Sequence, residues 1–179
     1  MLRIDRGGFL VVTLVLSMSA RLAAQDTLPW IEPTPARLKP AMGASVERFT
    51  YESYAITAVA FHYSGLKPNT ASTEIAVAVF PDALAAGALL LAPDIGAAYD
   101  ARGDGFDLLF KAGLSALTGI GGEILVLPGY HFGSGLLIRT AKASGVRVDV
   151  VRHAYLIEQR TEVFWSVGIG FTSLPRSKP

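Results

Sequence analysis

Large apolar residues recur at every second position along most of the chain from residue 46 onward. Side chains of a β-strand point alternately to its two faces, so a period of two predicts strand and not helix. The clearest stretch is residues 161–171, where the positions between the large residues are mostly small. Its large alternating members are Val163, Trp165, Val167, Ile169 and Phe171.

The same alternation appears in residues 46–65, 73–80, 88–99, 106–118 and 145–156. Segment 46–65, taken as one strand, places six residues on its apolar face: Phe49, Tyr51, Ala55, Val59, Phe61 and Tyr63. Its other face holds Arg48, Glu52, Tyr54 and His62. The apolar face of the other segments includes Leu89, Leu91, Phe106 and Phe110.

Turn signals rich in Gly, Pro, Asp and Asn separate these segments, and they are short enough to join antiparallel neighbours. Residues 119–140 allow two interpretations: two short strands around a turn near "HFGSG", or a loop followed by one strand from about residue 128. The first gives eight strands and the second gives seven. Antiparallel closure with both termini on the same side needs an even number, so we expect about eight.

A strand with one bulky apolar face and one nearly bare face fits a narrow barrel in a membrane. Bulky side chains then contact lipid, while a cramped lumen holds small residues and paired charges. The pattern therefore predicts an all-β protein, an antiparallel up-and-down β-barrel of about eight strands. With a periplasmic N-terminus, aromatic residues at the outer strand ends are Phe61, Tyr63, Tyr99, Phe106 and Trp165, and those at the inner ends are Phe49, Tyr51 and Phe171.

Composition supports this picture, since 51% of the 179 residues are hydrophobic and only 17% are charged. After the N-terminus no apolar stretch is long enough for a spanning helix. Residues 1–24 resemble a secretory signal, with cleavage after Ala24 or Ala23; an uncleaved anchor is disfavoured because its apolar core is too short. We expect a Pro-rich extended lead-in at 25–45, the barrel at 46–173 and a tail at 174–179.

Charge and cysteine content exclude several classes of protein. Removal of residues 1–24 takes three Arg and one Asp from 16 basic and 15 acidic residues, which leaves 13 and 14 and a net charge of −1. There is no basic patch of the kind that binds nucleic acid. With no cysteine, the chain has neither a disulfide scaffold nor a lipid-modified cysteine.

The segments "GVRVDVVRHAYL" and "TEVFWSVGIGFTSLP" resemble the last two strands of small bacterial outer-membrane β-barrels of the OmpA-like type. The resemblance covers roughly residues 46–173. It implies an eight-stranded up-and-down barrel inserted in the outer membrane, surrounded by its lipid and inserted by the outer-membrane assembly machinery.

Charged residues on the small face are expected inside the lumen, where they neutralise one another in a filled barrel or, less favourably, gate a pore. These are Asp107, Lys111, Arg139, Arg147 and Asp149, with Glu52 as a further candidate. His62, His131 and His153 have no metal-ligand spacing.

One arrangement could activate a serine nucleophile: His62 and Ser64 share a strand face, and Glu74 lies on the next strand. Some outer-membrane lipases and lipid A deacylases use such residues, although their trio lies late in the chain. "RGD" at 102–104 resembles an adhesive motif, but a tight exposed turn explains it better. We therefore assign no catalytic residue, no cofactor site and no metal site.

The function expected from the sequence is that of an integral outer-membrane barrel with a structural, adhesive or envelope-interaction role and no catalysis. A first alternative is a soluble periplasmic, lipocalin-like barrel that binds a small apolar ligand. It requires Leu89, Leu91, Phe110 and Val167 to point inward. A second, weaker alternative is a lipid A deacylase-like hydrolase built on His62, Ser64 and Glu74.

Overall fold

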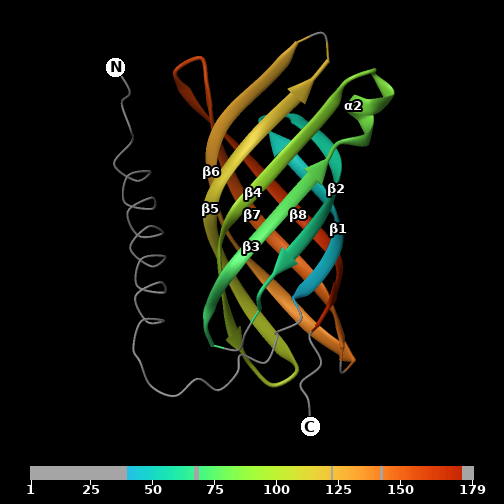
Figure 1. The fold of residues 1–179 in the computed structure, drawn as a ribbon, viewed down its shortest axis with the longest axis vertical. Helices are drawn as coiled ribbons and strands as arrows, with labels where there is room; N and C mark the ends of the chain where they lie inside the picture. Colours follow the sequence, from blue (N-terminus) through green and yellow to red (C-terminus); the bar gives the residue numbers. More distant parts are fainter. Residues whose placement is uncertain (1–39, 67–68, 122, 142, 175–179) are drawn as a thin grey trace.

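In a computed structural model the chain forms a closed antiparallel barrel of eight strands, each paired with its neighbours in sequence order (Figure 1). The structure describes residues 40–66, 69–121, 123–141 and 143–174. The expected signal peptide, most of the lead-in and nearly all of the tail lie outside them. The strands are β1 (Ala41–Tyr51), β2 (Tyr54–Ser64), β3 (Ala71–Val79), β4 (Leu89–Arg102), β5 (Phe106–Ile120), β6 (Ile124–Ala141), β7 (Ser144–Ile157) and β8 (Arg160–Ser173).

The barrel closes where β1 pairs with β8, so β1 begins and β8 ends at the same end of the barrel, here called the terminal end. The opposite end, here called the hairpin end, carries the connections 52–53, 80–88, 121–123 and 158–159. The connection between β3 and β4 contains the short helix α2 (Pro81–Ala85). In the described part of the chain, no helix has the length and apolar character needed to cross a membrane.

The expected number of eight strands is confirmed. The positions of two turns were predicted wrongly, and the two errors have opposite effects on the number of strands. Residues 46–65 are not one strand, because the chain reverses at Glu52 and Ser53 between β1 and β2. Glu52 has a φ of 50°, a left-handed conformation that its sequence does not signal. Residues 119–140, conversely, contain no turn near "HFGSG"; that motif lies within the continuous strand β6. Strand β1 also begins at Ala41, inside the expected lead-in.

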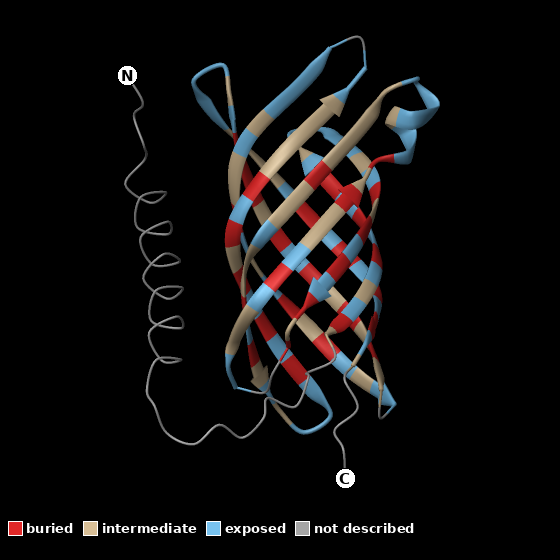
Figure 2. Ribbon diagram, in the orientation of Figure 1, coloured by how far each residue is buried: buried red, intermediate tan, exposed pale blue. Residues whose placement is uncertain are grey.

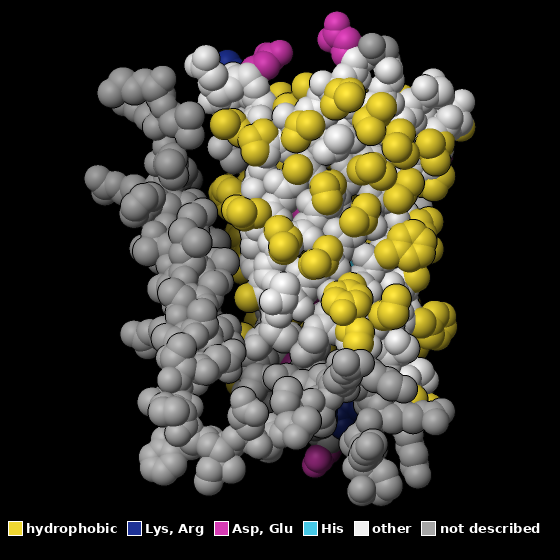
Figure 3. All heavy atoms as spheres, viewed as in Figure 1, with side chains coloured by type: hydrophobic (Ala, Val, Ile, Leu, Met, Phe, Trp, Pro, Cys, Tyr) yellow, Lys and Arg dark blue, Asp and Glu magenta, His cyan; other side chains and the backbone are white. Residues whose placement is uncertain are grey.

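The bulky face of the strands points outward and the small face inward, as the alternation predicts (Figure 2). Figure 3 shows apolar side chains spread over the visible wall of the barrel. Phe110 and Val167 are 52% and 54% exposed, which contradicts the lipocalin-like alternative because that fold requires them inside. Exposed large residues on the wall come from all eight strands, among them Val46, Phe61, Ile75, Ile95, Leu114, Phe132, Val150 and Ile169.

Strand β1 departs from the predicted orientation. Phe49 is buried in the lumen, and the hydroxyl of Tyr51 donates a hydrogen bond of 2.8 Å to Glu162 at the hairpin end. Arg48, expected inside, is exposed on the outer wall. The reason is the turn at residues 52–53: odd-numbered residues face inward on β1 and outward on β2, so one pattern cannot describe both strands.

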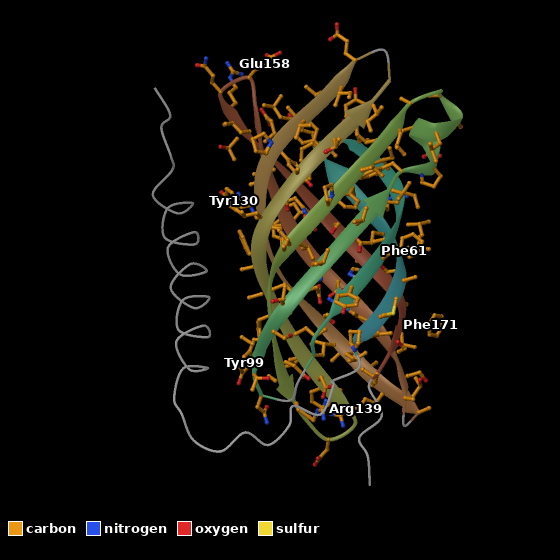
Figure 4. All side chains as sticks on the ribbon, in the orientation of Figure 1. Phe61, Tyr99, Tyr130, Arg139, Glu158 and Phe171 are labelled. Carbon is orange, nitrogen blue, oxygen red and sulfur yellow. The ribbon has the colours of Figure 1, made fainter. Side chains whose placement is uncertain are left out.

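The predicted division of the aromatic residues is wrong for the same reason. Because the turn at residues 52–53 was not predicted, each strand from β2 to β5 runs opposite to its predicted direction. The predicted turn near "HFGSG" does not exist, so β7 and β8 run in the predicted direction again. Trp165 does lie toward the hairpin end and Phe171 toward the terminal end, as expected. Three aromatic residues expected at the hairpin end lie toward the terminal end instead, as Figure 4 shows for Tyr99: Tyr63, Tyr99 and Phe106. Phe61, also expected at the hairpin end, lies nearer the middle of the barrel (Figure 4).

Candidate functional site

The barrel lumen holds most of the buried polar residues, and a charged cluster lies at its centre. Arg147 on β7 donates two hydrogen bonds to the Glu74 carboxylate on β3, at 2.8 and 3.0 Å, and one to Asp149 at 2.7 Å. Lys111 on β5 lies 3.1 Å from Asp149 and 3.5 Å from Glu74. Two carboxylates and two cations thus neutralise each other, as expected for a filled barrel. We call these four residues the central cluster.

A second set of ion pairs lies at the terminal end, where Figure 4 labels Arg139. Arg139 contacts both carboxylate oxygens of Asp107, which is fully buried, and donates a hydrogen bond of 2.9 Å to the Gly103 carbonyl. Arg102 lies 3.5 Å from both Asp100 and Asp107. The arginine of the "RGD" motif therefore pairs with lumen carboxylates, which supports a structural turn.

Of the residues that the sequence places in the lumen, Lys111, Arg147 and Asp149 meet in one cluster, while Asp107 and Arg139 form a separate pair. Glu52 is instead exposed in the turn between β1 and β2. Glu47 was missed, although recognition of that turn would have placed it on the inward face of β1.

Each histidine binds a serine inside the lumen. The Oγ atoms of Ser45, Ser115 and Ser166 lie 2.8 Å from His62 Nε2, 3.0 Å from His131 Nδ1 and 3.1 Å from His153 Nε2, respectively. Carboxylates complete the groups: Glu47 lies 3.4 Å from His62, and Asp94 lies 3.5 Å from His131 and 3.9 Å from His153. The expected trio of His62, Ser64 and Glu74 is not assembled, because His62 binds Ser45 and Glu74 binds Arg147.

A catalytic triad needs the serine at one ring nitrogen of the histidine and the carboxylate at the other. His62 and His131 have both partners at the same nitrogen. His153 alone has them at different nitrogens, but 3.9 Å is too long for a hydrogen bond to Asp94. Ser166 is also only 1% exposed, so no substrate reaches its hydroxyl in this conformation.

A cavity of about 20 Å³ lies among these groups, and its polar lining residues are Glu47, His62, Glu74, Asp94, Lys111, His131 and His153. This volume holds about one water molecule. Within the described ranges, no three His, Asp or Glu residues are arranged to hold a metal ion.

Apolar clusters close the lumen on both sides of the polar groups. Toward the hairpin end, Phe49 and Phe80 meet at a centroid distance of 5.0 Å, and buried alanines of β2, β3 and β4 surround them. Toward the terminal end, Leu109 and Leu137 pack with Ala41 and Leu66. The polar groups are therefore enclosed, in a lumen that side chains fill.

No protein-family model matches the sequence, and no curated protein matches it significantly. Among solved structures, the chain is similar to Neisserial surface protein A, with a TM-score of 0.54 and 9% identity over 75% of this chain and 94% of that chain. It is similar to the outer membrane protein OprG from Pseudomonas aeruginosa, with a TM-score of 0.52 and 9% identity over 77% of this chain and 94% of that chain. It is also similar to the N-terminal β-barrel domain of Pseudomonas aeruginosa OprF, with a TM-score of 0.50 and 15% identity over 75% of this chain and 99% of that chain.

At these identities the likeness concerns the fold. It agrees with the closed order of eight antiparallel strands and with the outward apolar face. The chain has the fold of the small eight-stranded outer-membrane β-barrels, the OmpA-like type that its sequence resembles.

Proposed function

We propose that this protein is an integral outer-membrane β-barrel with a structural role in the cell envelope, and that it is neither a pore nor an enzyme. The observation that carries this proposal is the apolar outer wall, to which all eight strands contribute exposed large side chains. Large apolar side chains exposed on all eight strands are unfavourable in water and favourable in hydrocarbon. Closure of the sheet also leaves no unpaired strand edge, which hydrocarbon does not tolerate.

The connections between strands favour a structural role over an adhesive one. Outer-membrane barrels carry their longer loops on the extracellular side. If both termini are periplasmic, the extracellular connections are residues 52–53, 80–88, 121–123 and 158–159, and the longest of them contains α2. Such short segments offer little surface to a partner outside the cell. Insertion by the outer-membrane assembly machinery belongs to the same proposal.

The lumen supports a barrel that neither conducts nor catalyses. Salt bridges join Glu74, Lys111, Arg147 and Asp149 across its centre, and apolar clusters lie above and below them. An eight-stranded barrel has an interior just wide enough for its own side chains. Because no serine in this network is both activated and accessible, the histidines are better explained as buried structural residues, each of which hydrogen-bonds a serine of the wall.

The test is fractionation of the expressed protein, with boiled and unboiled samples compared by electrophoresis. We expect recovery in the outer-membrane fraction and a shift in mobility on boiling, because a closed barrel resists detergent until it is heated. A soluble protein without a shift would contradict the membrane assignment. Separately, the folded protein should leave planar bilayers at baseline conductance, and steady single-channel currents would contradict the filled lumen.

A further inference from the structure

Two arginines interrupt the apolar outer wall close to each other. Strands β1 and β7 flank β8 (Figure 1). Arg48 on β1 and Arg152 on β7 lie on the outward faces of these two strands. Trp165 on β8 lies between these strands, since it is the direct cross-strand partner of Arg152 on one side and of Thr50 on the other. With adjacent strands about 4.8 Å apart and residues 3.3 Å apart along a strand, the two arginine Cα atoms are roughly 12 Å apart.

Neither of these arginines has a carboxylate partner among the described residues, whereas Arg102, Arg139 and Arg147 all form ion pairs. Instead, the guanidinium of Arg152 lies 5.2 Å from the centroid of the Phe132 ring, a cation–π contact on the outer wall. An unpaired arginine that faces lipid destabilises a membrane barrel, most strongly near the middle of the bilayer. The position of these two arginines along the barrel therefore matters.

Both arginines lie between the middle of their strands and the hairpin end, and Arg152 is only just past the middle of β7. Arg48 is three residues from the end of β1 at Tyr51, and Arg152 is five residues from the end of β7 at Ile157. At 3.3 Å per residue these separations are roughly 10 and 17 Å along tilted strands. An arginine side chain can cover part of this distance by extending toward the membrane interface. Trp165 beside it is exposed, and tryptophan is enriched at membrane interfaces.

We propose that Arg48, Arg152 and Trp165 form a binding site for the anionic phosphate headgroup of a membrane lipid in the leaflet at the hairpin end. The guanidinium group matches phosphate with paired hydrogen bonds. Arg48 and Arg152 lie on either side of β8, and the Arg152 side chain has to leave the Phe132 ring on β6 and turn toward β8 for both guanidinium groups to hold one headgroup. Thr50 supports the geometry, because its hydroxyl donates a hydrogen bond of 3.2 Å to the Trp165 carbonyl. This inference rests on the proposed membrane location.

The test uses Trp165 as its own reporter. The chain has two tryptophans, and replacement of Trp30 by Phe leaves Trp165 as the only one. The full-length variant is folded into phosphatidylcholine bilayers that contain either acyl-brominated phosphatidic acid or acyl-brominated phosphatidylcholine, since bromine quenches a neighbouring tryptophan. We expect phosphatidic acid to bind beside Trp165 more tightly than phosphatidylcholine, by roughly fivefold for each arginine.

In the same Trp30→Phe background, Arg48→Gln with Arg152→Gln should make the two brominated lipids quench equally. Arg160→Gln is the matched control, because Arg160 is an exposed arginine at the hairpin end of β8, and it should leave the preference intact. Equal quenching before the arginines are changed, or a preference that survives the double substitution, would overturn the proposal. The mobility shift on boiling is recorded for each variant, so a failure to form the membrane barrel is distinguished from a failure to bind the lipid.

Discussion

Arg147 and Glu74 are joined by two hydrogen bonds across the barrel, although they are 73 positions apart in sequence. Their strands, β7 and β3, stand opposite each other in the ring of eight. Lys111 and Asp149 extend this contact, so the central cluster connects opposite walls through the lumen. This arrangement makes the cluster a candidate for the main polar support of a narrow barrel.

Substitution of Arg147 by Met should destabilise the folded barrel strongly. It leaves Glu74 with Lys111 as its one remaining cation and removes the hydrogen bond to Asp149. Loss of one partner from a buried ion pair costs about 3–5 kcal/mol, because an uncompensated charge stays buried. Urea titration of the folded protein in detergent micelles, followed by its mobility shift, measures the change in the free energy of unfolding.

Arg160→Met serves as the control for this change, since Arg160 is exposed at the start of β8 and should contribute within about 0.5 kcal/mol. Combination of Arg147→Met with Glu74→Gln should recover part of the loss. If Arg147→Met were as stable as the unmodified barrel, the central cluster would have no supporting role.

The outward faces of β3, β4, β5, β7 and β8 could be predicted because each of these strands keeps a single alternation along its length. Inward charges such as Arg147 and Asp149 follow from the same alternation. Which charges meet could not be predicted, since contacts across the lumen depend on the order and stagger of all eight strands. The link between Arg147 and Glu74 is such a contact.

The two errors of position have identifiable physical causes. The turn between β1 and β2 uses Glu52 and Ser53 in place of Gly, Asn or Pro, so its sequence lacks the usual turn residues. In β6 the reverse holds, because Gly133 and Gly135 suggest a turn but face the lumen within a regular strand. There they lie directly opposite Val151 and Asp149 and leave room for those inward side chains.

Gly170 should be intolerant of a side chain because β8 and β1 approach closely where the barrel closes. A Cβ atom at this position would lie 2.5 Å from Ser45 Cα and 2.6 Å from Ser45 Cβ. We expect Gly170→Ala to destabilise the barrel by about 1–3 kcal/mol through overpacking, measured as a lower urea midpoint. Gly121→Ala is the comparison, since its nearest neighbour would be Ala88 Cβ at 3.8 Å, and an equal effect of both substitutions would argue against a close seam.

Phe49 should be a major apolar support of the lumen, contrary to its expected place in the lipid. Its ring packs against Phe80 at 5.0 Å and against His153 at 5.1 Å between ring centroids. Phe49→Ala should therefore cost about 3–5 kcal/mol, the range for a large aromatic residue removed from a packed core. Phe61→Ala, on the outer wall of β2, removes the same ring from lipid contact and should cost clearly less. Equal losses of urea stability in the two variants would contradict the inward orientation of Phe49.

The outer wall can be tested by placing a charge at its middle and at its end. Leu114 is near the centre of β5, 57% exposed, and its direct cross-strand partners are Ile95 and Tyr130. In a lipid bilayer, Leu114→Arg should weaken folding by about 2–4 kcal/mol. In water the same change at an exposed position would alter stability by less than about 0.5 kcal/mol. The measurement is a urea titration of folding into phosphatidylcholine vesicles.

Ile124 provides the matched position, because it begins β6 at the hairpin end and is 74% exposed. There an arginine reaches the aqueous side of the interface, so Ile124→Arg should cost only about 0–1 kcal/mol. A large difference in the loss of folding free energy between the two substitutions would require an environment that changes with depth along the barrel. Lipid provides such an environment and water does not. If both were tolerated equally, the apolar wall would face something other than a bilayer, and the membrane assignment would have to be abandoned.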